Sequence, residues 1–249
     1  MKNAIKYILI GFVQGITEFL PVSSSGHIVM FGSLFELDNL LLISVVAHIG
    51  TLFAVLFCYR KQIVELIKKP NNSTNKNLII ATIPTVIIVL LFNSFIEENF
   101  STSSLVWGFL LSAILLLIAD LKKEGTKKIT KKSALYMGLT QGLALLPGIS
   151  RSGSTLTCGL LIGLDKKEAL DFSFLMSIPI ILASAVYETI KLFNCQLSIN
   201  WFSILLVMIS SFIFGILSIK IMLKTVKKNK LYFFSIYLII LSLFVLLFL

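Results

Sequence analysis

Charged side chains are scarce in this sequence, and acidic ones are the scarcest. Of 249 residues only 12 are Asp or Glu, and 14% are charged at all, whereas 57% are hydrophobic. A soluble globular domain is about a quarter charged and about half apolar. This shortage excludes an ordinary soluble domain and predicts an integral membrane protein. The length predicts a single membrane domain, residues 1–249.

Cysteine is also rare, and its placement excludes two kinds of site. Cys58, Cys158 and Cys195 are far apart, and the sequence has no CxxC motif. We therefore expect neither a disulfide framework nor a thiolate metal site. We also expect no cleaved signal peptide, because Gln14 and Glu18 interrupt the first apolar run and no small-residue cleavage site follows.

Basic residues outnumber acidic ones by 22 to 12, which gives a formal net charge of +10. The lysines lie in short runs between apolar stretches, as in "KKEGTKKITKK" and "KTVKKNK". Basic loops of this kind mark the cytoplasmic side of a membrane protein. The charge therefore indicates contact with membrane lipids and no nucleic-acid partner.

Six apolar stretches are long enough, or nearly so, to cross a bilayer, which takes about 20 residues. They are 40–58, 78–95, 104–121, 172–190, 201–223 and 231–249. Two further apolar regions, 4–35 and 134–164, are broken by "LPVSSSGH" and "LPGISRSGST". Each arm is shorter than a span, and non-helical backbone is tolerated at membrane depth only inside protein or against water. We predict an all-α fold of six transmembrane helices and two re-entrant helical hairpins.

The loops predict how these elements are oriented. The basic loops that follow residues 58, 121 and 223 should be cytoplasmic, whereas acidic Glu97 and the loop 191–200 should lie outside. The first hairpin then ends near Glu36 on the outer side, and the second ends near Lys166 on the inner side. The two hairpins should therefore enter the membrane from opposite faces.

The broken regions are related by an internal repeat. "GFVQGITEFLPVSSSGH" aligns without a gap on "GLTQGLALLPGISRSGS" at an offset of 127 residues. Six pairs are identical: Gly11 and Gly138, Gln14 and Gln141, Gly15 and Gly142, Ser23 and Ser150, Ser25 and Ser152, Gly26 and Gly153. Three spans follow each copy, and an odd number of spans inverts the second copy. The repeat predicts inverted halves, roughly residues 1–125 and 126–249.

The tip of the first hairpin carries the groups for acid–base chemistry. Gln14 and Glu18 are four residues apart, so a helix places them on one face. Ser24 and His27 follow in the break. If the two tips meet, this carboxylate, hydroxyl and imidazole face Arg151 of the second tip.

The tip of the second hairpin suits an anion. It has no carboxylate or histidine, and it places Arg151 among Ser150, Ser152 and Thr155. The guanidinium fork matches phosphate oxygens. A glycine-rich turn and a helix N-terminus bring backbone N–H groups to the same anion. These four residues are the predicted phosphate site, for a phosphate group whose hydrocarbon tail stays in lipid.

Each of these residues also has a plainer structural interpretation. Three structural roles stay open. Arg151 could clamp Glu18, and the serines could be helix caps or packing residues. His27 could be a hydrogen-bonded core histidine. His48 is isolated in its span and is expected to form an interhelical hydrogen bond. Glu188 lies near a span end and is expected to extend to the interface.

At this level of detail the sequence resembles a known family. "QGITEFLPVSSSGH" and "PGISRSGST" are similar to the two signature regions of the undecaprenyl-diphosphatase, or bacitracin-resistance, family of bacterial inner-membrane enzymes. The first region has a Glu or Gln followed, after three residues, by a Glu, and Gln14 and Glu18 fill these two positions. The second, PGxSRSxxT, falls on 147–155 without a departure. Gln14 stands where many relatives have a second Glu, which weakens any mechanism that requires two carboxylates.

The resemblance implies hydrolysis of undecaprenyl diphosphate to undecaprenyl phosphate and phosphate. That reaction recycles the lipid carrier for peptidoglycan synthesis and confers bacitracin resistance. The resemblance also implies a multi-pass protein of the bacterial cytoplasmic membrane, with its site toward the periplasmic or external face. A divalent cation, Mg²⁺ or Ca²⁺, is expected at Glu18 with Gln14 beside it.

Glu18, Ser24, His27 and Arg151 are the predicted catalytic residues. Ser24 attacks phosphorus while Glu18 or His27 takes its proton, or else water attacks directly with Glu18 as the base. His27 then acts as the acid to the leaving phosphate or orients it. The sequence does not separate the serine route from the water route.

Other functions stay open at this stage. A transporter or flippase for polyprenyl phosphate would share the inverted repeat and the broken helices, although the reactive set exceeds what binding needs. A lipid phosphatase of the acid-phosphatase type would need SRxxxHxxxD, and Thr155 stands where its histidine should be. A homodimer is left open.

Overall fold

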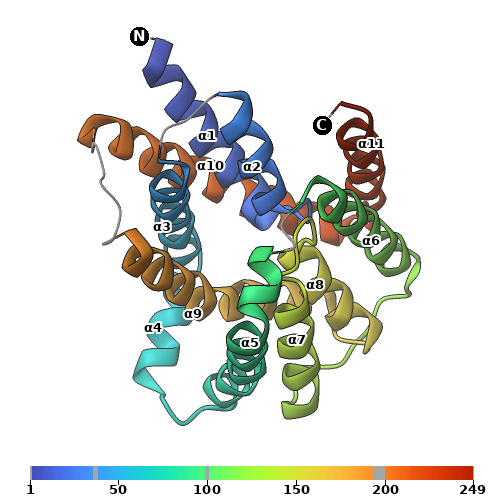
Figure 1. The fold of residues 1–249 in the computed structure, drawn as a ribbon. Helices are drawn as coiled ribbons and strands as arrows, with labels where there is room; N and C mark the ends of the chain where they lie inside the picture. Colours follow the sequence, from blue (N-terminus) through green and yellow to red (C-terminus); the bar gives the residue numbers. More distant parts are fainter. Residues whose placement is uncertain (1, 36–38, 99–100, 193–199, 249) are drawn as a thin grey trace.

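The computed structural model describes residues 2–35, 39–98, 101–192 and 200–248, and these form eleven α-helices (Figure 1). In chain order they are α1 (Lys2–Phe19), α2 (Ser24–Leu34), α3 (Leu40–Cys58), α4 (Arg60–Lys68), α5 (Ser73–Glu98), α6 (Thr102–Leu121), α7 (Lys131–Leu143), α8 (Arg151–Leu161), α9 (Lys166–Leu192), α10 (Trp201–Lys227) and α11 (Tyr232–Phe248). Within the described ranges there is one isolated β-bridge, between Lys127 and Leu164, and no strand. The predicted all-α class is confirmed.

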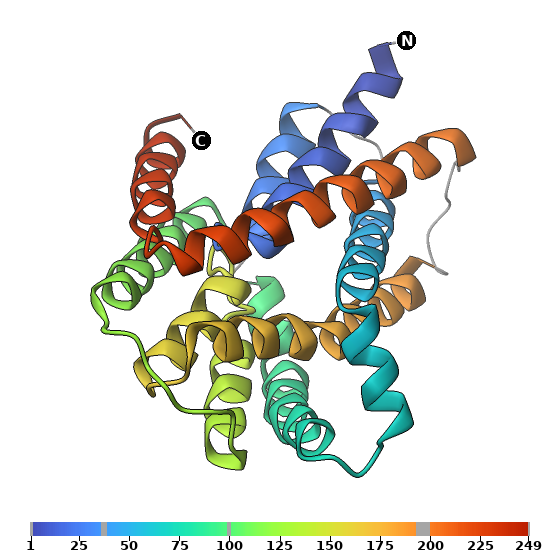
Figure 2. The same cartoon turned by 180° about the vertical axis from the view of Figure 1, so that it is seen from behind.

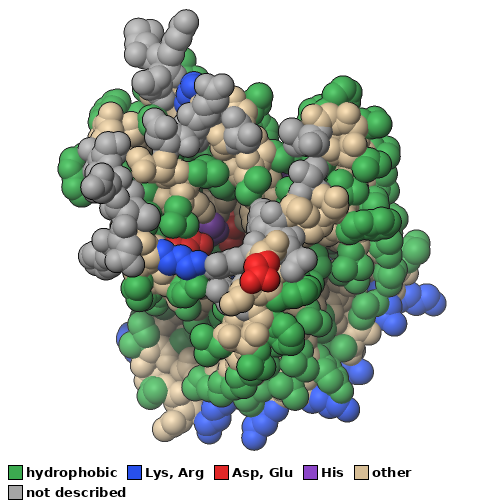
Figure 3. Space-filling model, in the orientation of Figure 1, with side chains coloured by type: hydrophobic (Ala, Val, Ile, Leu, Met, Phe, Trp, Pro, Cys, Tyr) green, Lys and Arg blue, Asp and Glu red, His purple; other side chains and the backbone are tan. Residues whose placement is uncertain are grey.

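Five helices, α3, α5, α6, α9 and α10, are long and apolar enough to cross a membrane. The last predicted span corresponds to α11, which is apolar but has only 17 residues. Hydrophobic side chains cover most of the face seen in Figure 3, with lysine and arginine gathered along its lower edge. The chain is therefore a multi-pass membrane protein whose apolar flank is suited to lipid.

The two broken regions fold as helical hairpins, with α1–α2 in the upper part and α7–α8 in the lower part of the views in Figures 1 and 2. Helix stops at Phe19 and Leu143 and resumes at Ser24 and Arg151. Three of the four arms, α2, α7 and α8, have 11 to 13 residues and match the expectation of short arms. The exception is α1, which has 18 residues.

The helices follow the 127-residue offset of the sequence repeat. Ser24 opens α2 and Arg151 opens α8, and both helices have 11 residues. Helix α1 of the first half packs against α10 of the second half, and the equivalent pair, α7 of the second half and α5 of the first half, also pack against each other. The first arm of each hairpin therefore packs against an equivalent long helix, and these two contacts position the hairpin tips.

A glycine at equivalent positions makes each of these packings possible. A Cβ built on Gly11 of α1 would lie 2.6 Å from the Val207 carbonyl oxygen of α10. A Cβ built on Gly138 of α7 would lie 2.2 Å from the Ala81 carbonyl oxygen of α5. Both helices approach a neighbouring backbone more closely than any side chain allows, which small residues permit in membrane bundles.

Replacing Gly138 by alanine is expected to destabilise the protein, because the methyl group meets backbone that cannot rotate away. Overpacking of this kind costs about 1–3 kcal/mol. Thermal unfolding in detergent measures the loss, with Leu139→Ala as the control, since Leu139 is 40% exposed on the neighbouring position. Equal melting temperatures for Gly138→Ala and the wild type would contradict this packing.

Aromatic side chains fill the centre, where Phe19, Phe109 and Phe174 are fully buried. Phe19 at the end of α1 meets Phe174 of α9 edge to face, with ring centroids 5.5 Å apart. This contact fixes the end of α1 just before the chain breaks. It therefore determines where the residues of the first tip lie.

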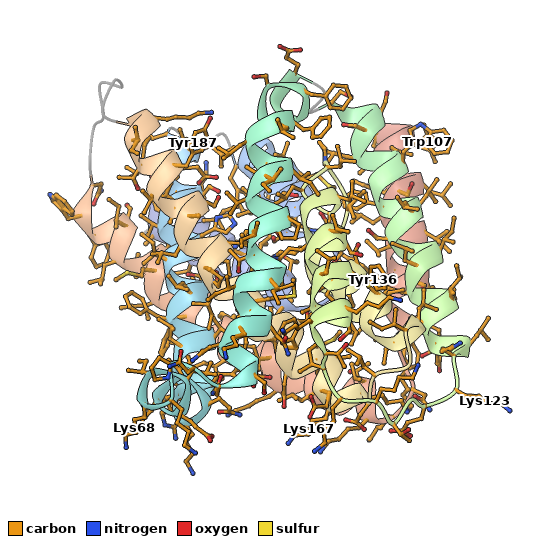
Figure 4. All side chains as sticks on the ribbon, turned by 90° about the horizontal axis from the view of Figure 1, so that it is seen from below. Lys68, Trp107, Lys123, Tyr136, Lys167 and Tyr187 are labelled. Atoms are coloured by element: carbon orange, nitrogen blue, oxygen red, sulfur yellow. The ribbon has the colours of Figure 1, made fainter. Side chains whose placement is uncertain are left out.

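The basic loops lie together at one end of the bundle. Figure 4 shows Lys68, Lys123 and Lys167 at this end and Trp107 and Tyr187 toward the other. The first basic loop contains a short helix, α4, that the sequence did not predict. The orientation expected from Glu36, from the Glu97 side chain and from residues 193–199 falls outside the described part of the chain.

Candidate active site

A pocket of about 300 Å³ lies where the two hairpin tips meet α3 and α9. Figure 3 shows the hollow, with acidic and histidine surface inside it. The polar residues that line it are Thr17, Glu18, Ser23, Ser24, Ser25, Ser44, His48, Ser150, Arg151, Ser184 and Glu188. The rest of the lining is apolar and comes mainly from α2, the second break and α9. A pocket with a polar floor and apolar walls suits an anionic head group on a hydrocarbon chain.

Glu18 is the centre of the polar floor. Its Oε2 accepts hydrogen bonds from Ser24 Oγ at 2.6 Å and from Gln14 Nε2 at 3.0 Å. Its Oε1 forms an ion pair with the Arg151 guanidinium. The spacing of Gln14 and Glu18 predicted one shared helix face, and the hydrogen bond between them confirms it.

Ser24 and Arg151 occupy equivalent positions in the repeat, each as the first residue of its helix. Both point at the same carboxylate, one to each oxygen. The two tips therefore meet, as predicted, and they meet at Glu18. The duplication brings two helix starts together, and the difference between Ser24 and Arg151 gives the pocket both a hydroxyl and a cation.

The ion pair is shielded from water, with the Glu18 side chain 4% and the Arg151 side chain 13% exposed. Buried ions are stable only when paired and fully hydrogen-bonded, and removal of one partner leaves an uncompensated charge. Glu18 meets this condition through Ser24, Gln14 and Arg151. The pocket is therefore built around one ionised carboxylate and one guanidinium.

His27 lies beside the pocket and does not line it. Its ring is 2% exposed, with Nδ1 2.7 Å from the Ser23 carbonyl oxygen and Nε2 2.6 Å from the Tyr237 hydroxyl. Both ring nitrogens are thus engaged within the protein. The catalytic role predicted for His27 stays a prediction, and its geometry suits an orienting role.

His48 lines the pocket instead. Its Nδ1 lies 2.9 Å from the Ser44 carbonyl oxygen in its own helix, and its Nε2 lies 3.9 Å from Glu18 Oε2. The expected interhelical hydrogen bond is therefore wrong, because the histidine is held within α3. The sequence pointed away from His48 because its spacing from Glu18 gives no hint that α3 and α1 are neighbours.

Glu188 is a second carboxylate in the pocket. Ser184 donates to its Oε1 at 3.3 Å, and its buried Oε2 has no hydrogen-bond partner. The expectation that Glu188 extends to the interface is therefore wrong. No motif includes Glu188, and only the packing of α9 against the tips reveals it.

The hydroxyls of the second tip mainly hold the turn in shape. Ser150 Oγ caps α8 by accepting from Gly153 N at 3.1 Å, and it lines the pocket. Ser152 donates to the Leu20 carbonyl oxygen at 3.1 Å, which ties the two tips together. Thr155 lies 2.6 Å from Ser173 Oγ. Neither Ser152 nor Thr155 lines the pocket, and their predicted phosphate contacts stay predictions.

These features define a multi-pass membrane protein with a pocket between two paired hairpins, lined by a carboxylate, a guanidinium and several hydroxyls. The family model described as "Bacitracin resistance protein BacA" matches residues 7–244, and the chain belongs to this family.

Among curated proteins the chain is similar to the undecaprenyl-diphosphatase of Carboxydothermus hydrogenoformans, with 39% identity over 96% of this chain and 95% of the relative. It is 39% identical to undecaprenyl-diphosphatase 3 of Bacillus cereus, over 94% of this chain and 93% of the relative. It is 42% identical to the undecaprenyl-diphosphatase of Thermosipho melanesiensis, over 95% of this chain and 96% of the relative.

Proposed function

We propose that this chain is an undecaprenyl-diphosphatase, which releases the terminal phosphate of undecaprenyl diphosphate and leaves undecaprenyl phosphate. One observation carries the proposal: Glu18 binds both the Ser24 hydroxyl and the Arg151 guanidinium in a pocket with apolar walls. Such a site pairs a nucleophile with a base and supplies a cation for the phosphate. The relatives, which are undecaprenyl-diphosphatases by name and match over nearly their whole length, support the same activity.

In the proposed reaction Ser24 Oγ attacks the terminal phosphorus and its proton passes to Glu18. The bond from that phosphorus to the bridging oxygen breaks, and undecaprenyl phosphate leaves with the bridging oxygen. The leaving undecaprenyl phosphate takes up the proton from Glu18, so the carboxylate is free again. Water then attacks the phosphoserine and gives a proton to Glu18. The bond from phosphorus to Ser24 Oγ breaks and Oγ takes that proton back, which releases phosphate and restores Ser24. The 2.6 Å hydrogen bond between Ser24 and Glu18 supports this route over direct attack by water.

Arg151 connects substrate binding to this chemistry. Its guanidinium pairs with Glu18 and neutralises it, which makes the carboxylate a weaker base. A bound diphosphate offers more negative charge and a better match to the guanidinium fork. As Arg151 turns to the phosphate, Glu18 loses part of its counter-charge and becomes a stronger base at the moment it is needed.

The residues present fit a divalent cation only in part. The Gln14 Oε1 atom is buried beside Glu18 without a hydrogen-bond partner, as is Glu188 Oε2 in the pocket. Hard cations prefer such oxygen donors. No cluster of three or more His, Cys, Asp or Glu in the described part of the chain could hold a metal ion. We propose that the oxygens of Glu18, Gln14 and Glu188 would hold a Mg²⁺ or Ca²⁺ ion, which would supply neutralisation of charge on the phosphates.

We further propose six spans, α3, α5, α6, α9, α10 and α11, with the two hairpins re-entering from opposite faces as an inverted repeat. Support comes from the matched helix starts 127 residues apart and from the lysines gathered at one end (Figure 4). The pocket is lined by Ser44 near the start of α3 and by Glu188 near the end of α9. The basic loops follow the C-terminal ends of α3 and α6. Lysine-rich loops are cytoplasmic, so the pocket would open to the external side.

The purified protein in detergent is expected to release phosphate from undecaprenyl diphosphate and to lose most of this activity when a chelator removes divalent cations. Restoring Mg²⁺ or Ca²⁺ should restore the rate, because the cation again neutralises negative charge on the phosphates.

Phosphate measured in detergent separates an enzyme from a transporter, since a micelle has no two sides for a lipid to cross. Undecaprenyl phosphate serves as the control lipid and should release none. An intact diphosphate lipid after prolonged incubation with Mg²⁺ would contradict the proposed function. Full activity in excess chelator would contradict only the cation.

A further inference from the structure

The imidazole of His27 is held from two directions, by its own turn and by the last helix of the chain. Nδ1 lies 2.7 Å from the carbonyl oxygen of Ser23. On the other side Nε2 lies 2.6 Å from the hydroxyl of Tyr237 in α11, 210 residues away in sequence. The two rings are nearly parallel, with centroids 5.8 Å apart and an angle of 9° between their planes.

The chemistry of these partners determines where the proton sits. A carbonyl oxygen only accepts hydrogen bonds, so Nδ1 carries the proton that binds Ser23. In a neutral ring Nε2 then has a lone pair, which accepts the O–H of Tyr237. Burial favours the neutral ring, because none of the carboxylates that the structure describes contacts His27 and its side chain is almost fully enclosed.

The turn that His27 holds is a strained one. Ser23 has a φ of 67°, in the left-handed region that a residue with a Cβ rarely adopts. The next residue, Ser24, opens α2 and points its hydroxyl at Glu18. A hydrogen bond to the Ser23 carbonyl therefore fixes the backbone immediately before the proposed nucleophile.

The other neighbours of His27 leave the ring little freedom. The Phe109 ring of α6 packs on it edge to face at 6.1 Å. A Cβ on Gly26 would lie 2.5 Å from the same phenyl ring, so α6 presses directly on the turn. Phe109 limits the position of the imidazole, whereas Tyr237 bonds to Nε2 and so holds the ring with Nδ1 on the Ser23 carbonyl oxygen.

We propose that Tyr237 is a positioning residue for the phosphatase reaction, acting through His27 on the Ser23–Ser24 turn. Its hydroxyl holds the His27 ring at Nε2 so that the Nδ1 proton stays on the Ser23 carbonyl oxygen, and that hydrogen bond holds Ser24 in line with Glu18. The inference rests on the proposed function for its effect on rate, and on the geometry alone for its effect on His27.

Tyr237→Phe keeps the ring and removes only the hydroxyl. The kcat for phosphate release is expected to fall about three- to tenfold, the effect of one lost hydrogen bond, while KM stays unchanged because Arg151 and the pocket walls are untouched. Tyr232→Phe is the matched control, since it removes a hydroxyl from the same helix away from the turn. That control should retain the wild-type kcat.

Nitrogen NMR of the histidines measures the contact between His27 and Tyr237 independently of enzymatic activity. The chain has only two histidines, His27 and His48, and a His48→Gln sample assigns the signals. We expect His27 as the neutral form protonated on Nδ1, and a shifted Nε2 signal in Tyr237→Phe but not in Tyr232→Phe.

An unshifted His27 signal in Tyr237→Phe would overturn this inference, as would an unchanged kcat. If the wild type releases no phosphate, the proposed function fails instead, and the His27 signal still reports whether the Tyr237 hydroxyl bonds to Nε2.

Discussion

Replacing Glu18 by glutamine is expected to lower the rate of phosphate release about a thousandfold, within the range for loss of a general base. Glutamine keeps the size of the side chain but cannot take a proton from Ser24 or neutralise Arg151. Ser24 then has a neutral acceptor in place of the base 2.6 Å away, and the guanidinium loses its counter-ion in a buried site. Initial rates of phosphate release, measured at equal amounts of inserted protein, give the effect.

Glu65→Gln is the matched control for Glu18→Gln. Glu65 is an exposed carboxylate on α4 that pairs with Lys69 at 3.5 Å, so the same chemical change there should leave the rate within about twofold of the wild type, as expected for an exposed surface pair. Retention of more than a tenth of the wild-type rate by Glu18→Gln would remove Glu18 as the base. A thermal unfolding curve for each variant separates lost chemistry from lost fold.

Replacing Arg151 by alanine is expected to lower kcat about a hundred- to a thousandfold, the usual effect of removing a group that stabilises charge in the transition state. KM should rise as well, because the guanidinium also binds the phosphates of the ground state. Arg151→Lys should recover only part of the loss, since a single ammonium cannot form the paired hydrogen bonds of the fork. Steady-state kinetics with undecaprenyl diphosphate in detergent measure all three quantities.

The chain has one other arginine, Arg60, and it gives the control. Arg60 is exposed on α4, donates to the Phe57 carbonyl oxygen and lies over the Phe57 ring. Arg60→Ala should leave kcat and KM unchanged. An Arg151→Ala enzyme with wild-type kcat would reduce Arg151 to a structural clamp on Glu18.

Much of the fold could be predicted because its signals are local. The predicted span 40–58 has the bounds of α3, and the predicted breaks fall where helix stops. The length of an apolar stretch predicts a span, and Pro, Gly and Ser in a short run predict a break in it. Both signals lie within one segment of the sequence. The repeat added a relation between distant segments, and the matched starts of α2 and α8 follow it.

The site could be predicted where one tip or the repeat determined the contact. Gln14 and Glu18 share a face by spacing alone, and the pairing of the tips brings Ser24 and Arg151 to Glu18. Contacts set by helix packing could not be read from the sequence. His48 looked isolated, yet α3 turns it into the pocket.

His27, Tyr237 and Glu188 show the same limit. His27 stands in the motif, but its ring is turned to Tyr237, which lies 210 residues further along the chain. Glu188 belongs to no motif and enters the pocket only because α9 packs beside α3. Which way a side chain points across a helix boundary depends on the neighbouring helix, and nothing in the local sequence encodes that neighbour.

The central claim is that the two hairpin tips act as one catalytic unit joined at Glu18. The most direct test is the rate of phosphate release by the double variant Glu18→Gln/Arg151→Ala beside the two single variants. Residues that act as a unit are not additive, so the double variant should be about as slow as the slower single variant. Losses that multiply, so that the double variant is slower by the product of the two factors, would mean that Glu18 and Arg151 act independently and would contradict the account.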